Sequence, residues 1–329
     1  ENGSYKIGAS IGICIVDGET SSAGEILKRA DSAMYAAKRL GGNSFSFYDP
    51  SIQEEIDRKL QIEREIIGAI EQRQFCAYFQ PQIDTRGNVV GAEALIRWVH
   101  PVRGLISPAS FIPIAENSGL IFQLQNIVLE DSCRLLNELK KQHGVPEDFA
   151  ISVNISSNQF KTGKLDENLL KVMKQFGVTP QSIILEITES LLMQNKNEAV
   201  SQMQRLKKLG FRFSVDDFGT GYSSLAYLHA LPLDELKIDK TFVDQISMHD
   251  SGTAIIDSII SLAGHLRLHV VAEGVETAAQ FEVLAQRPIQ AVQGYLFSKP
   301  LPRDEFKRWV ANSSEARHLQ AQRAVHTPV

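Results

Sequence analysis

The sequence repeatedly places a polar residue, most often an acid, inside or at the end of a short apolar segment. The residues in these positions are Glu93, Asn154, Glu186, Asp216, Asp217, Lys237, Glu273 and Gln293. A single acid in such a place is usually a helix cap or a loop carboxylate. Because acids recur here together with an asparagine, a lysine and a glutamine, we interpret the set as one shared site.

The chemistry of this set favours metal binding. Carboxylates gathered in one pocket repel one another, and divalent cations relieve that repulsion. The available ligands are carboxylate and amide oxygens without His or Cys, which favours Mg²⁺ or Mn²⁺ over zinc. The adjacent acids Asp216 and Asp217 favour two ions, because one acid can bridge them. Paired metals of this kind cleave phosphodiesters by clamping the anionic substrate and activating a bound water.

Alternating strands and helices are predicted to position these residues. Strands are expected at 76–83, 88–98, 149–155, 183–188, 211–216, 235–239, 268–272 and 291–295. Helices are expected at 119–141, 165–176, 196–209, 222–230, 250–266 and 277–286. Only "DTRGN" separates the first two strands, which is too short for a parallel crossover. The pattern predicts a TIM-like (β/α)₈ barrel with an antiparallel first strand and with the polar residues at one mouth.

A smaller α/β segment precedes this barrel. Strands are expected at 5–16 and in "SFSFYD", on either side of an amphipathic helix at 23–39. A charged helix over 52–70 follows, with an apolar stripe formed by Ile52, Ile56, Leu60, Ile66 and Ile70. This helix is either an interdomain signalling helix or dimer contact, or a linker helix packed on its neighbour. The expected divisions are a partial α/β segment at 1–50, a linker helix at 51–72, the main domain at 73–311 and a disordered polar tail at 312–329.

Composition narrows the possible partners. A net charge of −5 argues against a nucleic-acid polymer, which requires a basic surface. The distant cysteines Cys14, Cys76 and Cys133 predict a reducing, cytoplasmic setting. No apolar run is long enough to cross a bilayer, and the chain begins at Glu1 in what reads as the middle of a domain. We therefore expect a fragment of a longer protein, in which missing segments supply any membrane anchor.

Seven ordered motifs identify a family resemblance over residues 73–311. They are "EALIRWVHP", "VNIS", "EITES", "DDFGTGYSSL", "LKID", "AEGVET" and "QGYLFSKP". Together they closely resemble the EAL-domain cyclic di-GMP phosphodiesterases of bacteria. The resemblance implies a TIM-like barrel, a homodimer formed through this domain, and hydrolysis of cyclic di-GMP to linear pGpG.

The resemblance also implies a role for each site residue. Glu93, Asn154, Glu186 and Asp216 would hold one metal ion, and Asp216, Asp217 and Glu273 the second. Lys237 would position the attacking water and the phosphate, Gln293 would help to orient the water, and Arg97 would bind a substrate phosphate. Weaker candidates for the nucleotide pocket are Gln80, Glu276 and Tyr295. Glu189 would lie away from the metals and anchor the DDFGTG loop.

The N-terminal segment resembles the last third of a GGDEF, or diguanylate cyclase, domain. The resemblance rests on "ASIGICI" and "LKRADSAMYAAKRLGGN". The GGDEF signature itself is absent, and Gly42 stands where the family pattern usually has an arginine. We therefore expect this chain to make no cyclic di-GMP from GTP.

Two alternatives to an active phosphodiesterase remain. A catalytically weak EAL domain acts as a cyclic di-GMP receptor or regulatory module, but such receptors usually lack a metal ligand or the lysine. A different barrel enzyme that stabilises an enolate with Mg²⁺ also places carboxylates at strand ends. The complete set of metal positions and Lys237 favours the enzyme over both alternatives.

Overall fold

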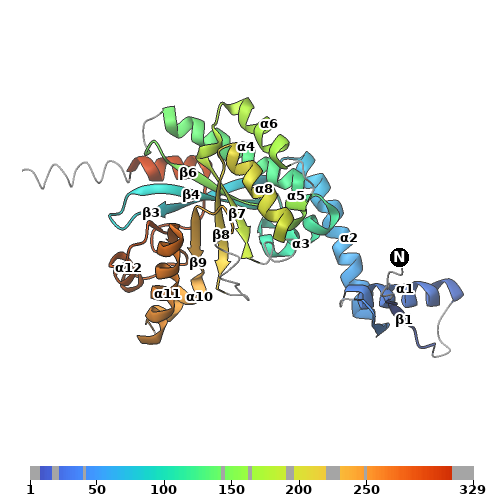
Figure 1. Cartoon of the computed structure of the whole chain (residues 1–329). Coiled ribbons are helices and arrows are strands. Elements are labelled where there is room, and N and C mark those ends of the chain that lie inside the picture. The colour runs from blue at the N-terminus through green and yellow to red at the C-terminus, as the bar shows by residue number, and fades with distance from the viewer. Residues whose placement is uncertain are drawn as a thin grey trace, which may run out of the picture.

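Eight strands close into a barrel in the computed structural model of the chain (Figure 1). The structure describes residues 8–16, 22–39, 42–141, 145–161, 165–189, 196–219, 230–247 and 250–312. The barrel strands are β3 (Phe75–Ile83), β4 (Val89–His100), β6 (Ala150–Asn154), β7 (Ile183–Thr188), β8 (Arg212–Phe218), β9 (Glu235–Ile238), β10 (His269–Ala272) and β11 (Ala291–Val292). The fold predicted from the sequence is therefore confirmed.

The first barrel strand, β3, runs against all its neighbours. It pairs antiparallel with β4 on one side and with β11 on the other, whereas the other barrel pairs are parallel. The turn from β3 to β4 is closed by Asp84, whose carboxylate accepts hydrogen bonds from the backbone N–H groups of Arg86 and Asn88. Gly87 in this turn has φ +84°, a conformation that glycine adopts without strain.

Helices cover the outside of the barrel. They are α3 (Pro108–Ser118), α4 (Ile121–Lys141), α5 (Ser157–Lys161), α6 (Leu165–Phe176), α8 (Lys196–Lys208), α10 (Lys240–Val243), α11 (Asp250–Leu266) and α12 (Ala278–Ala285). Short 3₁₀ helices occupy η1 (Pro180–Ser182) and η2 (Asp244–Ser247), and residues 303–312 are helical. Two short strands, β5 (Gly104–Ile106) and β12 (Leu301–Pro302), extend the sheet beside β4 and β3. Apolar side chains from the strands and helices form one large core between the two layers.

The predicted helix 119–141 corresponds to α4, and a further helix, α3, precedes it. Helix α3 ends at Ser118, and Gly119 has φ +77°, a left-handed conformation that ends a helix. Helix α4 then begins at Ile121. The sequence analysis assigned no helix to residues 108–118. Pro108 lies in the first turn, where the helix does not need its N–H group.

The N-terminal segment forms a small βαβ unit that connects to the barrel through a long helix. Strands β1 (Ile11–Ile13) and β2 (Phe45–Phe47) are parallel and flank α1 (Ala23–Arg39). Helix α2 (Pro50–Glu71) leads from this unit to the barrel (Figure 1). The predicted strand 5–16 is too long within the described residues, where only Ile11–Ile13 form it.

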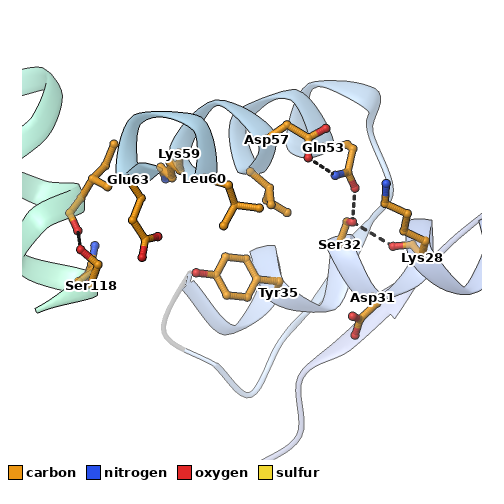
Figure 2. Close-up of a pocket in the computed structure, with 13 residues that line it drawn as sticks. Lys28, Asp31, Ser32, Tyr35, Gln53, Asp57, Lys59, Leu60, Glu63 and Ser118 are labelled. Atoms are coloured by element: carbon orange, nitrogen blue, oxygen red, sulfur yellow. Dashed lines mark hydrogen bonds between the residues drawn. The ribbon is translucent and has the colours of Figure 1, made fainter. Parts of the chain in front are cut away.

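The apolar stripe of α2 divides between two environments. Ile66 is buried beside the barrel, in a second apolar cluster with Phe75, Trp98 and Phe111. Leu60 is 46% exposed and faces a cleft of about 700 Å³. Figure 2 shows Tyr35 of α1 and Leu60 of α2 lining this cleft, with Ser118 of α3 at its far end. The C-terminal half of α2 is therefore buried against the barrel, whereas its N-terminal half contacts α1, where Ser32 Oγ donates a hydrogen bond of 2.6 Å to Gln53 Oε1.

The predicted helix at 222–230 and the predicted disordered tail fall almost entirely outside the described residues. In the part of the chain that is described, none of the helices is both long and apolar enough to cross a bilayer.

Candidate active site

Lys237 lies at the centre of a group of carboxylates inside the barrel mouth. Its side chain is fully buried, and its ammonium nitrogen Nζ is 2.5 Å from Glu273 Oε1 and 3.0 Å from Glu186 Oε1. The same nitrogen lies 3.5 Å from Glu93 Oε2 and 3.5 Å from Asp216 Oδ1. Four acids that lie within or directly after four different strands therefore converge on one cation.

The strand register explains this convergence. Side chains two residues apart on a strand share a face, so Glu235 and Lys237 both point into the barrel. Asn154 pairs with Glu186 on the neighbouring strand, at the same level of the sheet. Because β4 and β6 to β11 are parallel, their carboxyl ends meet at one rim, where barrel enzymes place their active sites.

Glu93 is held by hydrogen bonds on both carboxylate oxygens. Asn154 Nδ2 donates to Glu93 Oε1 over 3.0 Å, and Gln293 Nε2 donates to Glu93 Oε2 over 2.6 Å. Gln293 Nε2 also donates to Gln80 Oε1 over 3.2 Å. These contacts bring Asn154, Gln293 and Gln80 into the same group as the acids.

The electrostatics show an excess of negative charge. Burial opposes the ammonium of Lys237, but the surrounding carboxylates outweigh burial and hold its pKa well above the usual value. Burial and the neighbouring Glu93 raise the pKa of Glu186 well above its ordinary value. Burial also raises the pKa of Glu273 to about 8, although Lys237 opposes this. One lysine therefore does not neutralise the whole group.

The pKa of Glu93 is shifted in the opposite direction from those of Glu186 and Glu273. Burial favours its neutral form, but the ammonium of Lys237 and the hydrogen bonds from Gln293 and Asn154 outweigh burial and lower its pKa. In contrast to Glu186 and Glu273, Glu93 is thus kept ionised by its surroundings, which suits a metal ligand.

The donor atoms of this group fit a hard divalent cation. Glu186 Oε2 is buried without a hydrogen-bond partner among the described residues, so a strong acceptor is left to bind a cation. Asn154 uses its amide nitrogen on Glu93, which leaves its oxygen for an ion. Within the described ranges, no three His, Cys, Asp or Glu side chains form a ready-made cage, since the carboxylates converge on Lys237. Binding of metal ions would require these carboxylates to share their contacts between Lys237 and the ions.

The two adjacent aspartates occupy different environments. Asp216 lies in the group around Lys237, whereas Asp217 is exposed at its edge. Asp217 has φ +55°, and the pairing of β8 with β9 shifts between Val215 and Phe218. The backbone therefore turns at Asp217. Burial and the charge of Asp216 raise the pKa of Asp217.

Glu189 contacts the loop that follows these aspartates. Its Oε2 accepts a hydrogen bond of 3.4 Å from the backbone N–H of Gly219. Glu189 is itself buried and does not belong to the group around Lys237. This contact is compatible with the predicted role of Glu189 as an anchor of the loop.

The predicted substrate-binding residues lie around the rim of the mouth. Arg97 is half-buried, with its guanidinium 5.9 Å from the centre of the Tyr78 ring, and burial lowers its pKa. Tyr295 is 57% exposed and lies beneath the ammonium of Lys299. Glu276 forms an ion pair of 2.9 Å with Lys240.

Two residues near the site escaped the sequence analysis. Gln82 is buried and donates to Gln293 Oε1, and its spacing of two residues from Gln80 on one strand was the available signal. Lys240 holds Glu276, but its position in a loop-like stretch after "LKID" gave no sign of that contact.

Comparisons with known proteins define the class of this chain. The model of the EAL domain family matches residues 63–300, and the model of the diguanylate cyclase, GGDEF domain family matches residues 1–44. The EAL match covers most of the chain, which therefore belongs to the EAL domain family. The predicted family membership is thus confirmed.

Individual relatives support this classification. The bifunctional diguanylate cyclase/cyclic di-GMP phosphodiesterase MucR of Pseudomonas aeruginosa is 38% identical over 93% of this chain and 44% of MucR. The cyclic di-GMP phosphodiesterase NbdA of the same organism is 38% identical over 89% of this chain and 37% of NbdA. The solved PaMucR phosphodiesterase in complex with c-di-GMP has a TM-score of 0.71 and 38% identity, covering 75% of this chain and 99% of that one. The chain spans less than half the length of the two curated relatives.

Proposed function

We propose that this chain hydrolyses one phosphodiester bond of cyclic di-GMP and releases linear pGpG, with divalent metal ions as cofactors. The observation that carries the proposal is the group of four carboxylates around the buried Lys237. Its support from outside the chain is the similarity to MucR, whose phosphodiesterase domain has been solved with c-di-GMP. The reaction would lower the concentration of a bacterial second messenger.

The metal ligands in this proposal are the oxygen donors at the mouth. Glu93, Asn154, Glu186 and Asp216 would hold one Mg²⁺ or Mn²⁺ ion. Asp216, Asp217 and Glu273 would hold or orient a second ion. Such a pair of ions would stabilise the negative charge of the phosphate oxygens. It would also lower the pKa of a bound water, so that hydroxide is available as the nucleophile.

The remaining residues bind and orient the reactants. Lys237 would position both the attacking water and the phosphate, because its ammonium lies at the centre of the acids. Arg97 would bind a substrate phosphate with its guanidinium fork. In the reaction the water oxygen bonds to phosphorus, the P–O3′ bond breaks, and the ribose oxygen leaves as a hydroxyl after gaining a proton. Gln293, which donates a hydrogen bond to Glu93, would help to orient the attacking water.

A neighbouring cleft offers space for part of the nucleotide. It has a volume of about 300 Å³ and is lined by Arg97, Asn154, Glu116 and Gln125, among mainly apolar side chains. Because Arg97 and Asn154 also border the carboxylate group, we place one guanosine half of the substrate here. Gln80, Glu276 and Tyr295 would contact the nucleotide from the opposite side of the mouth.

The proposed context is a homodimer formed through the EAL domain in the bacterial cytoplasm. Support comes from the family resemblance and from the free state of the cysteines. Any attachment to a membrane would come from parts of a longer protein. Sedimentation of the purified chain tests the dimer, and a monomer at micromolar concentration would contradict it.

One assay tests the function directly. The chain is incubated with cyclic di-GMP and Mg²⁺ or Mn²⁺, and nucleotide products are separated by chromatography. We expect pGpG, no product in excess chelator, and suppression by Ca²⁺, which is larger and coordinates more loosely. Full activity in chelator would contradict the role of metals. Tight binding of cyclic di-GMP without hydrolysis would instead support the receptor alternative.

A further inference from the structure

Gln82 lies one layer below the carboxylate group inside the barrel. Gln293 links the two, because it accepts a hydrogen bond from Gln82 and donates one to Glu93. Its side chain is 4% exposed inside the barrel. Gln82 Nε2 donates a hydrogen bond of 3.2 Å to Gln293 Oε1, and Gln293 is also 4% exposed. Both amides are therefore buried, where a lost hydrogen bond is not replaced by bulk water.

The contact from Gln82 determines which end of the Gln293 amide faces Glu93. A glutamine amide has an accepting oxygen and a donating NH₂ group, and it can be turned either way. Because Gln82 donates, it selects the oxygen of Gln293. The NH₂ group of Gln293 then points to Glu93 Oε2 at 2.6 Å and to Gln80 Oε1 at 3.2 Å. In the reversed orientation two oxygens, those of Gln293 and Glu93, would face each other.

Gly91 provides the space that Gln82 requires. The two residues are directly opposite each other in the antiparallel pair of β3 and β4. A Cβ atom at position 91 would lie 2.6 Å from Gln82 Oε1, so the end of the Gln82 side chain would have to move, and 3.2 Å from the backbone oxygen of Ala150. The glycine on β4 and the glutamine on β3 are therefore sterically matched.

We propose that Gln82 and Gly91 are positioning residues that set the orientation of Gln293 and, through it, the placement of the Glu93 carboxylate. This inference rests on the proposed function, because it assigns Glu93 to metal binding. Gln82 touches no reacting atom in this scheme. Residues that orient metal ligands from behind typically change metal affinity or activity by about 10- to 100-fold when replaced.

A double-mutant cycle on metal binding tests the contact between the two glutamines. Mn²⁺ is titrated calorimetrically into the full chain carrying Gln82→Met, Gln293→Met or both, and steady-state kinetics are measured in parallel. Gln82→Met retains side-chain length but removes the donor, so we expect Mn²⁺ affinity and kcat to fall about tenfold. KM for cyclic di-GMP should stay within about twofold, since no substrate contact is lost. In the Gln293→Met background, Gln82→Met should have no further effect.

The steric match between Gln82 and Gly91 is tested by a second pair of variants. Gly91→Ala should displace Gln82 and reproduce the tenfold loss of Mn²⁺ affinity. In a Gln82→Ala background the contact with Gln82 Oε1 is gone and only the 3.2 Å approach to the Ala150 backbone oxygen remains, so Gly91→Ala should lower Mn²⁺ affinity by less than in the wild-type background. Equal losses in both backgrounds would overturn the steric match.

A matched control separates positioning from general packing. Gln202 is a buried glutamine on the outer helix α8, and Gln202→Met should leave Mn²⁺ binding unchanged. If wild type binds Mn²⁺ and Gln82→Met binds it equally well, the positioning role is refuted while the proposed function stands. If wild type binds no Mn²⁺, both fail. A variant that unfolds below the assay temperature is replaced by Gln82→Leu, for which the same loss is expected.

Discussion

At the barrel mouth a lysine is fully buried among four acids, whereas at the junction of α1 and α2 large apolar side chains are half exposed (Figure 2). Tyr35 and Leu60, which line the junction cleft, are 51% and 46% exposed. At the mouth the arrangement opposes ordinary burial preferences, because charges are removed from water. The arrangement at the junction also opposes ordinary burial preferences, because apolar surface is left in water.

The difference between these regions lies in what fixes each one. The acids at the mouth are held by the closed hydrogen-bonded barrel and by Lys237, so unfavourable burial of charge is maintained by the fold. At the junction a hydrogen bond from Ser32 Oγ to Gln53 Oε1 joins the two helices, but Tyr35 and Leu60 stay half exposed. Apolar surface exposed on one face typically marks a site for contact with other protein. Buried charge thus indicates chemistry, and exposed apolar surface indicates an interface.

The largest expected effect follows from removing Lys237. Lys237→Met leaves four acids without their cation, so the free energy of unfolding should fall by about 3–5 kcal/mol in chelator. Added Mn²⁺ should restore much of this stability, because an ion that binds only the folded state stabilises it. Urea unfolding with and without Mn²⁺ measures both effects.

Lys240→Met provides the control for that experiment. Lys240 also has two carboxylate partners, Asp244 and Glu276, but it is 44% exposed. Solvent weakens such pairs, so its replacement should change stability by less than about 1 kcal/mol. Equal losses for the two lysines would contradict the special role assigned to the buried one.

The next effect distinguishes metal binding from substrate binding at the mouth. Glu93→Ala should lower kcat at least about 100-fold, because the residue is a metal ligand in our scheme. Arg97→Ala should mainly raise KM, by about tenfold, because it contacts a phosphate. Initial rates over a range of cyclic di-GMP concentrations separate the two. Near-normal turnover by Glu93→Ala would show that the site assignment is wrong.

A smaller effect is expected from the loop contact of Glu189. Glu189→Ala removes the hydrogen bond to Gly219 N–H without removing a metal ligand, so turnover should fall about tenfold. Asp217→Asn should also lose activity, while one ion remains bound. Calorimetric titration with Mn²⁺ alongside turnover compares the variants. Wild-type activity of Glu189→Ala would contradict the anchoring role of Glu189, and two tightly bound ions in Asp217→Asn would contradict the role of Asp217 at the second ion.

The smallest effect should appear at the junction. Leu60→Ala should change the free energy of unfolding by less than about 0.5 kcal/mol and leave turnover within about twofold. Ile66→Ala on the same helix should cost about 2–5 kcal/mol, since Ile66 is buried beside the barrel. Urea unfolding of the two variants compares the halves of α2. A large loss for Leu60→Ala would show that the junction is more firmly packed than its exposure indicates.

The barrel could be predicted because its signals are local. The spacing of apolar strands and polar strand ends follows from the alternation of side chains, and "DTRGN" is too short for any but an antiparallel connection. Helix α3 is harder to predict from local propensity, because Pro113 lies inside it and proline is unfavourable within a helix.

The contacts within the site could not be predicted from the same signals. The sequence indicated which residues share the mouth, but not that Lys237 Nζ would approach four carboxylates. That arrangement depends on the barrel's closure across strands far apart in the chain. Gln82 was missed for a similar reason, since its partner Gln293 comes from the last barrel strand.

The reversed direction of β3 determines where the chain enters the barrel. In an all-parallel barrel the first strand starts at the face opposite the active site, so a preceding segment would arrive there. Here β3 starts at the catalytic rim, and α2 ends just before it, packed against α3. A rotation or displacement of α2 would therefore be transmitted to the rim over a single helix length. Reversing one strand thus places the preceding segment and the carboxylate group on the same side of the barrel.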